Sequence, residues 1–183
     1  MGVLYCRKEV PIARRAFGGG QEHSLRSGTE NLPGIVGMGK AAAITQEIWQ
    51  ERAAYDQKLR DHLMDRLLTE IPYSYVNGSL SRRVPHNLHI SFAYIEGEAL
   101  LLQMDRKGVG LSSGSACSAG SGEPSHVLTA MHLPPERLQA ALRITLGEGN
   151  TMEEMDYVAD MFCDRVALLR SMSPLMPKEE KHS

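Results

Sequence analysis

The stretch Ala141–Val158, ALRITLGEGNTMEEMDYV, predicts a strand, a turn and the start of a helix in immediate succession. Ala141–Leu146 combines apolar and β-branched residues, which is typical of a strand. Thr151 and Glu154 form a T-x-x-E capping box, so a helix is expected to begin there. The apolar residues that follow fall at helical spacing: Met155, Val158, Ala159, Phe162, Val166 and Leu169.

Upstream of this unit the sequence predicts more short strands and helices. Val84–Phe92, VPHNLHISF, alternates like a strand, and Gly108–Leu111 is expected to form another. A short helix is predicted over Glu96–Arg106, and a further one opening at Glu123–Pro124. This mixture predicts a small α/β domain in the C-terminal part of the chain.

The N-terminal part has a different texture. A short strand is expected at Gly2–Cys6, followed by a glycine-rich loop over Phe17–Asn31. Asn31 can cap a helix with an apolar face, and a second, more charged helix is predicted from Thr45 to Glu70. The predicted domains are residues 1–45, the end of a larger domain; 46–175, a linking helix and the small α/β domain; and 176–183, a loose tail.

Composition excludes several classes of protein. The chain has 183 residues, 42% of them hydrophobic, so a folded core is expected. Its net charge is −2 and no Lys/Arg cluster dominates a face, which argues against nucleic-acid binding. No apolar run approaches the length of a membrane span. Three cysteines without a close pair suit a reducing compartment, so a cytoplasmic protein is expected.

The segment Leu111–Leu128, LSSGSACSAGSGEPSHVL, places one thiol among serines, glycines and alanines. Small neighbours leave a thiolate accessible as a nucleophile, so Cys117 is the candidate catalytic residue. On composition alone, a cysteine that merely fills a serine- and glycine-rich linker is equally plausible. Cys6 and Cys163 are interpreted as packing residues.

Two other chemistries compete for this thiol. A cysteine hydrolase needs a base, and His126 lies close in sequence, but no orienting Asp or Asn is evident. A metal site has less support, because there is no C-x-x-C motif. His86 and His89, three residues apart on the predicted strand, are expected to point to opposite faces.

The cysteine segment resembles the active-site loop of NifS/IscS-type cysteine desulfurases, pyridoxal-phosphate enzymes of the class-V aminotransferase family. Further segments match that family in the same order, and together they span Gly2 to Leu175: GGGQEHSLRSGTEN (18–31), VPHNLHISF (84–92), EGEALLLQMD (96–105) and LRITLGEGNTMEEMDYV (142–158). The resemblance implies an α/β chain of PLP-dependent fold type I, comprising the small C-terminal domain and the last part of the large domain.

The resemblance also implies roles for three residues. Cys117 would attack the sulfur of L-cysteine, leaving L-alanine and a persulfide for iron–sulfur cluster assembly or another sulfur-transfer pathway. Cys117 would also be a transient iron–sulfur ligand, and no other metal site is implied. Arg143 would clamp the substrate carboxylate, a task that suits a guanidinium fork. Thr29 would contact the phosphate of pyridoxal 5'-phosphate in the other subunit, which implies a homodimer.

One part of the family's site is expected outside this chain. None of Lys8, Lys40, Lys58 or Lys107 matches the context of the cofactor-anchoring lysine. The chain is therefore interpreted as the C-terminal half of a desulfurase, in a truncated or split form with a separate N-terminal half. The alternatives are a non-catalytic persulfide-carrying partner subunit and a selenocysteine lyase. A sulfur acceptor or iron–sulfur scaffold protein is the implied partner.

Overall fold

The computed structural model describes residues 1–113 and 125–176. The chain divides into two compact units, Met1–Gln50 (unit 1) and Glu51–Ser183 (unit 2), and each is described by itself. The division falls within the long helix α1, Leu32–Glu70. The domain boundary expected at residue 45 stays a prediction.

Unit 2 is built on a four-stranded antiparallel sheet in the order β1-β2-β4-β3. The strands are β1 (Ser74–Val76), β2 (Asn87–Phe92), β3 (Ser112–Ser113) and β4 (Ala141–Thr145). Side chains alternate between the two faces of a strand, so every second residue of β2 faces the core. Leu88, Ile90 and Phe92 accordingly are fully or almost fully buried.

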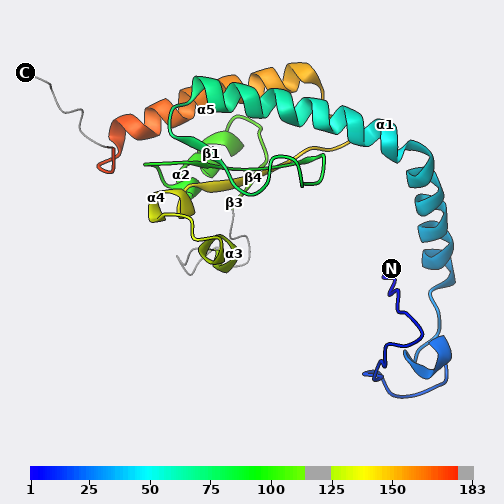
Figure 1. The fold of residues 1–183 in the computed structure, drawn as a ribbon. Coiled ribbons are helices and arrows are strands. Elements are labelled where there is room, and N and C mark those ends of the chain that lie inside the picture. Colours follow the sequence, from blue (N-terminus) through cyan, green and yellow to red (C-terminus); the bar gives the residue numbers. More distant parts are fainter. Residues whose placement is uncertain (114–124, 177–183) are drawn as a thin grey trace, which may run out of the picture. The chain divides into compact units, whose positions relative to one another are not determined.

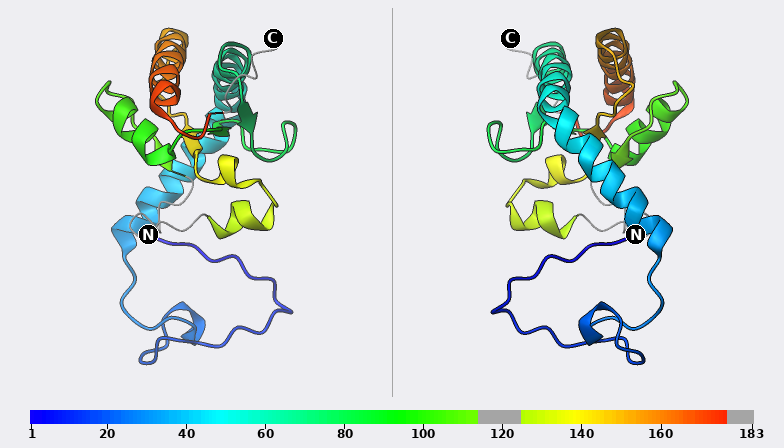
Figure 2. Two further views of the ribbon diagram at one scale, coloured as in Figure 1. Left: turned by 90° about the vertical axis from the view of Figure 1, so that its left-hand side faces the viewer. Right: turned by 90° about the vertical axis from the view of Figure 1, so that its right-hand side faces the viewer.

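Helices cover that apolar face. Residues 51–70 of α1 and helix α5 (Met152–Met172) lie side by side over the sheet, and α2 (Gly97–Asp105) packs beside α5 (Figures 1 and 2). The two phenylalanine rings of Phe92 and Phe162 stack with their centroids 5.1 Å apart. The helices contribute these buried side chains: Leu59, Leu63 and Leu67 from α1, Leu100 and Met104 from α2, and Met155, Ala159, Phe162 and Val166 from α5.

The predicted capping box forms at the start of α5. The Thr151 hydroxyl accepts a hydrogen bond from the Glu154 amide, and the Glu154 carboxylate accepts one from the Thr151 amide, both at 3.2 Å. Two amide groups that the helix leaves without partners are thus satisfied. The box fixes where α5 begins and therefore which of its residues face the sheet.

We expect Thr151→Ala to lower the free energy of unfolding by about 1 kcal/mol, because the helix loses its N-terminal acceptor. Urea unfolding followed by circular dichroism measures this loss. Thr69→Ala on the exposed surface of α1 is the matched control and should change stability by less than about 0.5 kcal/mol. An equal loss in both variants would show that the cap contributes nothing.

Charged side chains join α1 to α5 at the surface. Arg66 donates to both carboxylate oxygens of Glu70 (2.6 and 2.9 Å), to Asp160 (2.7 Å) and to Asp156 (3.3 Å). His62 lies 2.6 Å from the Asp156 carboxylate. The hydrogen bond from Arg66 lowers the pKa of Glu70, and the bond with His62, followed by Arg66, lowers that of Asp156.

These lowered carboxyl pKa values give stability a predictable pH dependence. A carboxylate with a lowered pKa stabilises the fold above its ordinary value, here 4.5 for Glu70 and 3.8 for Asp156. That stability is lost as the pH falls through the lowered values. We expect Arg66→Met to be less stable than wild type at pH 7 and to approach wild type below about pH 4.

Urea titrations of both proteins between pH 7 and pH 3 measure this difference. Lys58→Met removes the same charge from an exposed position on the same helix and is the control. A difference between Arg66→Met and wild type that stays constant with pH would contradict the assignment.

Unit 1 contains no buried residue. Its apolar side chains are exposed, among them Phe17 (77%) and Val36 (67%). The predicted strand at Gly2–Cys6 is wrong, since no described segment pairs with it. Among the helices of the described ranges, none has the length and apolar character needed to cross a membrane.

Two more predictions need correction. The two predicted N-terminal helices are one continuous helix, because the Thr45 hydroxyl bonds back to the Ala41 carbonyl (2.9 Å) instead of capping a new helix. The strand predicted at Gly108–Leu111 begins only at Ser112. The amides of Gly108 and Val109 instead bond to carbonyls at the end of α2, and Gly108 has a φ of 77° that suits this helix end.

The remaining predicted elements are confirmed with small shifts at their ends. Asn31 accepts a hydrogen bond from the Gly34 amide at 3.1 Å and caps α1. The structure also contains the short helices α3 (His126–Ala130) and α4 (Pro135–Leu138) and a single turn, η1 (Glu22–Ser24). Glu123 and Pro124, where a helix was expected to open, lie outside the described residues.

Candidate functional site

The sheet face opposite the core carries a cluster of polar side chains, which we call the polar face: Asn77, His89, Ser91, Ser112 and Arg143. The strand register places Arg143 of β4 between His89 of β2 and Ser112 of β3. Helices α3 and α4 lie on this side of the sheet, away from α1 and α5 (Figures 1 and 2). The predicted substrate-binding residue thus lies on the side of the sheet that the core does not use.

Arg143 is exposed, whereas its neighbours on β4, Leu142 and Ile144, are buried in the core. The apolar neighbours fix the strand, so the pleat must present Arg143 on the opposite face. A guanidinium at such a place can donate two parallel hydrogen bonds to one carboxylate. The geometry is therefore compatible with a carboxylate clamp.

Asn77 organises the polar face from the end of β1. It is 5% exposed, and its amide nitrogen donates to Nδ1 of His89 (3.0 Å) and to the Ser91 hydroxyl (2.7 Å). Its amide oxygen accepts from Nη2 of Arg137 on α4 (2.7 Å). The Asn77 backbone carbonyl accepts from Arg83 (2.9 Å), and its amide donates to the His89 carbonyl (2.9 Å). Every polar atom of this buried residue has a partner.

These bonds determine the protonation of His89. A guanidinium can only donate, so Arg137 fixes the Asn77 amide with its oxygen toward the guanidinium and its nitrogen toward His89. Nδ1 of His89 must then accept, and the proton of the neutral ring is on Nε2. Burial lowers the pKa of His89, and the charges of Arg143 and Arg83 lower it further.

Thr29 lies in unit 1, and its side chain is exposed. It follows Gly28, which has a φ of 113° and donates its amide to the Gln21 side chain (3.2 Å). The same loop holds η1, whose residues have positive φ values of 50, 54 and 65°. Such angles cost about 1 kcal/mol or more per residue outside glycine, so this loop is strained.

The three cysteines differ in how far the structure describes them. Cys117 lies outside the described residues, so its role stays a prediction. Cys163 on α5 is half-buried against the core, as predicted, and burial together with a hydrogen bond to Glu70 raises the pKa of its thiol to about 11. Cys6 is exposed, so its interpretation as a packing residue is wrong.

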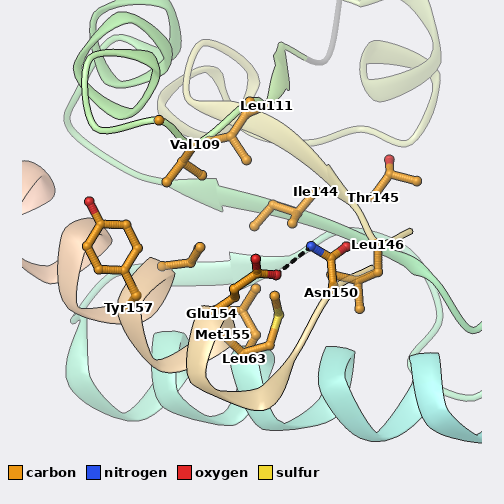
Figure 3. Close-up of a pocket in the computed structure, with 13 residues that line it drawn as sticks. Leu63, Val109, Leu111, Ile144, Thr145, Leu146, Asn150, Glu154, Met155 and Tyr157 are labelled. Carbon is orange, nitrogen blue, oxygen red and sulfur yellow. Dashed lines mark hydrogen bonds between the residues drawn. The ribbon is translucent and has the colours of Figure 1, made fainter. Parts of the chain in front are cut away.

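A pocket of about 270 Å³ lies where the segment 108–111, the end of β4 and the start of α5 meet (Figure 3). Its walls combine apolar side chains, including Leu63, Val109 and Ile144, with a similar share of polar surface. Its polar pair, Asn150 and Glu154, is already joined by a 2.9 Å hydrogen bond. The lining residues include neither Arg143 nor Thr29, so this pocket is separate from the predicted site.

Sequence reasoning missed the Asn77–His89–Ser91 network. The signal that was present is the alternation in β2, where Asn87, His89 and Ser91 are polar and the residues between them apolar. The prediction that His86 and His89 lie on one strand is wrong, because His86 precedes β2. Within residues 1–113 and 125–176, no three His, Cys, Asp or Glu side chains are grouped as a metal site.

Comparison with known proteins identifies the family. Residues 1–158 match the family model "Aminotransferase class-V". The chain is 47% identical, over 97% of its length, to a protein named cysteine desulfurase IscS from Methanosarcina thermophila, and it covers 44% of that protein. It is 45% identical, over 96% of its length, to cysteine desulfurase IscS 1 from Archaeoglobus fulgidus, covering 46% of that relative.

The fold has solved counterparts. A structure described as a NifS-like protein superposes on 90% of this chain, with a TM-score of 0.78 and 36% identity, and the chain covers 42% of it. The chain therefore belongs to the class-V aminotransferase family, and the predicted PLP-dependent type I fold is confirmed. It spans a little under half the length of the curated relatives that it matches.

Proposed function

We propose that this chain is the sulfur-accepting and substrate-binding part of a cysteine desulfurase. The observation that carries the proposal is Arg143, which the sheet presents on its polar face within a chain 47% identical to a cysteine desulfurase. In the proposed reaction L-cysteine and the Cys117 thiol give L-alanine and a Cys117 persulfide. A sulfur–sulfur bond forms, the substrate carbon–sulfur bond breaks, and the atoms balance.

The residues of this chain fit pyridoxal 5'-phosphate, which the family implies. Thr29 offers an exposed hydroxyl beside the open turn at Gly28, where a phosphate can approach without meeting a side chain. When bound, the cofactor supplies an electron sink for breaking the carbon–sulfur bond. Thr29 would hold its phosphate in a second subunit, so the proposed assembly is a homodimer.

The anchoring lysine is proposed to come from a segment that is not among these 183 residues. The described lysines Lys8, Lys40, Lys58 and Lys107 are all exposed, which suits solvated surface positions. Sulfur would pass from Cys117 to an acceptor or iron–sulfur scaffold protein in the cytoplasm. The alternative of a persulfide-carrying partner subunit uses the same Cys117 without cofactor chemistry of its own.

Sulfide release from L-cysteine tests the proposal. The purified chain is incubated with pyridoxal phosphate and a reducing thiol, alone and with a polypeptide that spans the remaining N-terminal half of a cysteine desulfurase relative. Release only in the presence of the second polypeptide supports a cofactor lysine outside these 183 residues. Release by the chain alone would refute the separate lysine, and no release in either mixture would refute the desulfurase assignment. L-Selenocysteine run in parallel tests the lyase alternative.

A further inference from the structure

We propose that His89 determines substrate specificity by donating its Nε2–H to the same carboxylate that Arg143 binds. This inference rests on the proposed function, in which Arg143 holds the α-carboxylate of L-cysteine. His89 and Arg143 are directly opposite each other on neighbouring antiparallel strands. Residues in such a pair have Cβ atoms about 4.5–5.5 Å apart and lie on one face, so both side chains can reach one small ligand.

The hydrogen bond at Nδ1 of His89 sets the direction of the other ring nitrogen, Nε2. Asn77 lies beyond β1 and holds Nδ1 of His89 at 3.0 Å. β4 flanks β2 on the other side. Nδ1 and Nε2 lie on opposite sides of the imidazole ring, so Nε2–H points away from Asn77, and Arg143 is the residue opposite His89 on the strand that flanks this side of β2.

His89 differs from an ordinary surface histidine because the buried side chain that orients its ring, Asn77, is itself held by further contacts. Asn77 is itself fixed by Arg137 (2.7 Å), and the Arg137 guanidinium stacks 4.7 Å from the Tyr75 ring centroid. An imidazole whose orientation is set through buried partners loses little further freedom when a ligand binds. This arrangement suits a hydrogen-bond donor that must meet a ligand atom at one place.

The charges around His89 keep the donor neutral. The charged groups that face it are Arg143 on β4 and Arg83 in the segment between β1 and β2, while Arg137 on α4 is one residue further away, behind Asn77. The pKa of His89 is lowered by burial and by the first two cations. His89 therefore adds a directed hydrogen bond without adding a further charge, as expected for a site that takes one α-carboxylate.

Heteronuclear NMR of the imidazole nitrogens in the purified 183-residue chain tests the first step. We expect a neutral His89 ring with the proton on Nε2, which titrates below the ordinary histidine value of 6.5. Observation of a proton on Nδ1 in the neutral ring, or titration at or above 6.5, would overturn the inference.

Titration with L-alanine, the product of the proposed reaction, tests the second step. The His89 signals should shift saturably with L-alanine and not with L-alaninamide, which lacks the carboxylate. His89→Phe should weaken L-alanine binding about tenfold, because one hydrogen bond to a charged group is lost. His89→Gln retains a distal N–H donor and should recover most of that loss, and it also serves if the phenylalanine variant does not fold.

Arg143→Ala separates failure of this inference from failure of the proposed function. Loss of L-alanine binding in Arg143→Ala with unchanged binding in both His89 variants would reject the role of His89 and leave the carboxylate clamp intact. Binding that is absent in wild type, or unchanged in Arg143→Ala, would reject the clamp, and the role of His89 would fall with it.

Discussion

In the reconstituted desulfurase reaction, a Cys117→Ser chain is expected to release no sulfide above the enzyme-free background. A serine hydroxyl cannot accept a sulfur atom as a persulfide, so the loss should be complete and not partial. Sulfide measured after addition of a reducing thiol gives the rate. Mass spectrometry of the protein should show the added sulfur atom in wild type and not in the variant.

Cys163→Ser is the matched control and should keep the wild-type rate. With a thiol pKa of about 11, about one Cys163 side chain in ten thousand carries the reactive thiolate at pH 7. Its hydrogen bond to Glu70 is a further reason for a structural role. Persulfide found on Cys163 in the Cys117→Ser chain, with continued sulfide release, would show that the nucleophile had been assigned to the wrong residue.

Local signals explain which elements could be predicted. The capping box of Thr151 and Glu154 satisfies amides within one turn, so its effect needs no distant partner. The alternation around Leu88 and Ile90 likewise reports a sheet with one buried face. These elements were found because their physical cause lies within a few residues of sequence.

Elements that depend on distant partners were missed. β1 has only three residues, Ser74–Val76, and exists because it pairs with β2. The unbroken α1 shows the converse, because a second helix was predicted to begin at Thr45, whereas the Thr45 hydroxyl bonds to the Ala41 carbonyl within one continuous helix. Arg143 was identified from its family resemblance, whereas its place beside His89 follows only from the strand register.

The polar network shows most clearly why part of the site could not be predicted from the sequence. Its members come from the end of β1, from β2 and from α4, and Asn77 and Arg137 are 60 residues apart. No local pattern marks Asn77, which lies in a turn-like stretch of polar residues. Its importance comes from burial among donors and acceptors that the fold brings together.

Replacement of Asn77 by alanine is therefore expected to have the largest effect on stability among the polar-face substitutions. The variant removes the hydrogen-bond donor of the fully buried Ser91 hydroxyl and the acceptor for Arg137. A buried polar group left without a partner costs about 1–3 kcal/mol, so the free energy of unfolding should fall by about 2–4 kcal/mol. Asn87→Ala, on β2 at a half-buried position, is the control and should cost less than about 1 kcal/mol.

Asn77→Asp tests the same network through the sign of a pH dependence. In wild type the lowered pKa of His89 means that the unfolded chain binds the proton better, so His89 makes stability fall as the pH drops below about 6.5. An aspartate can still accept from Arg137, but it offers His89 an acceptor, so His89 should take a proton on Nδ1 and its pKa should rise. In the variant, the stabilisation of the fold by protonated His89 should be complete below about pH 6.5 and be lost as the pH rises. Urea unfolding between pH 5.5 and 8 should show opposite changes in wild type and variant, and parallel curves would mean that Asn77 does not set the charge of His89.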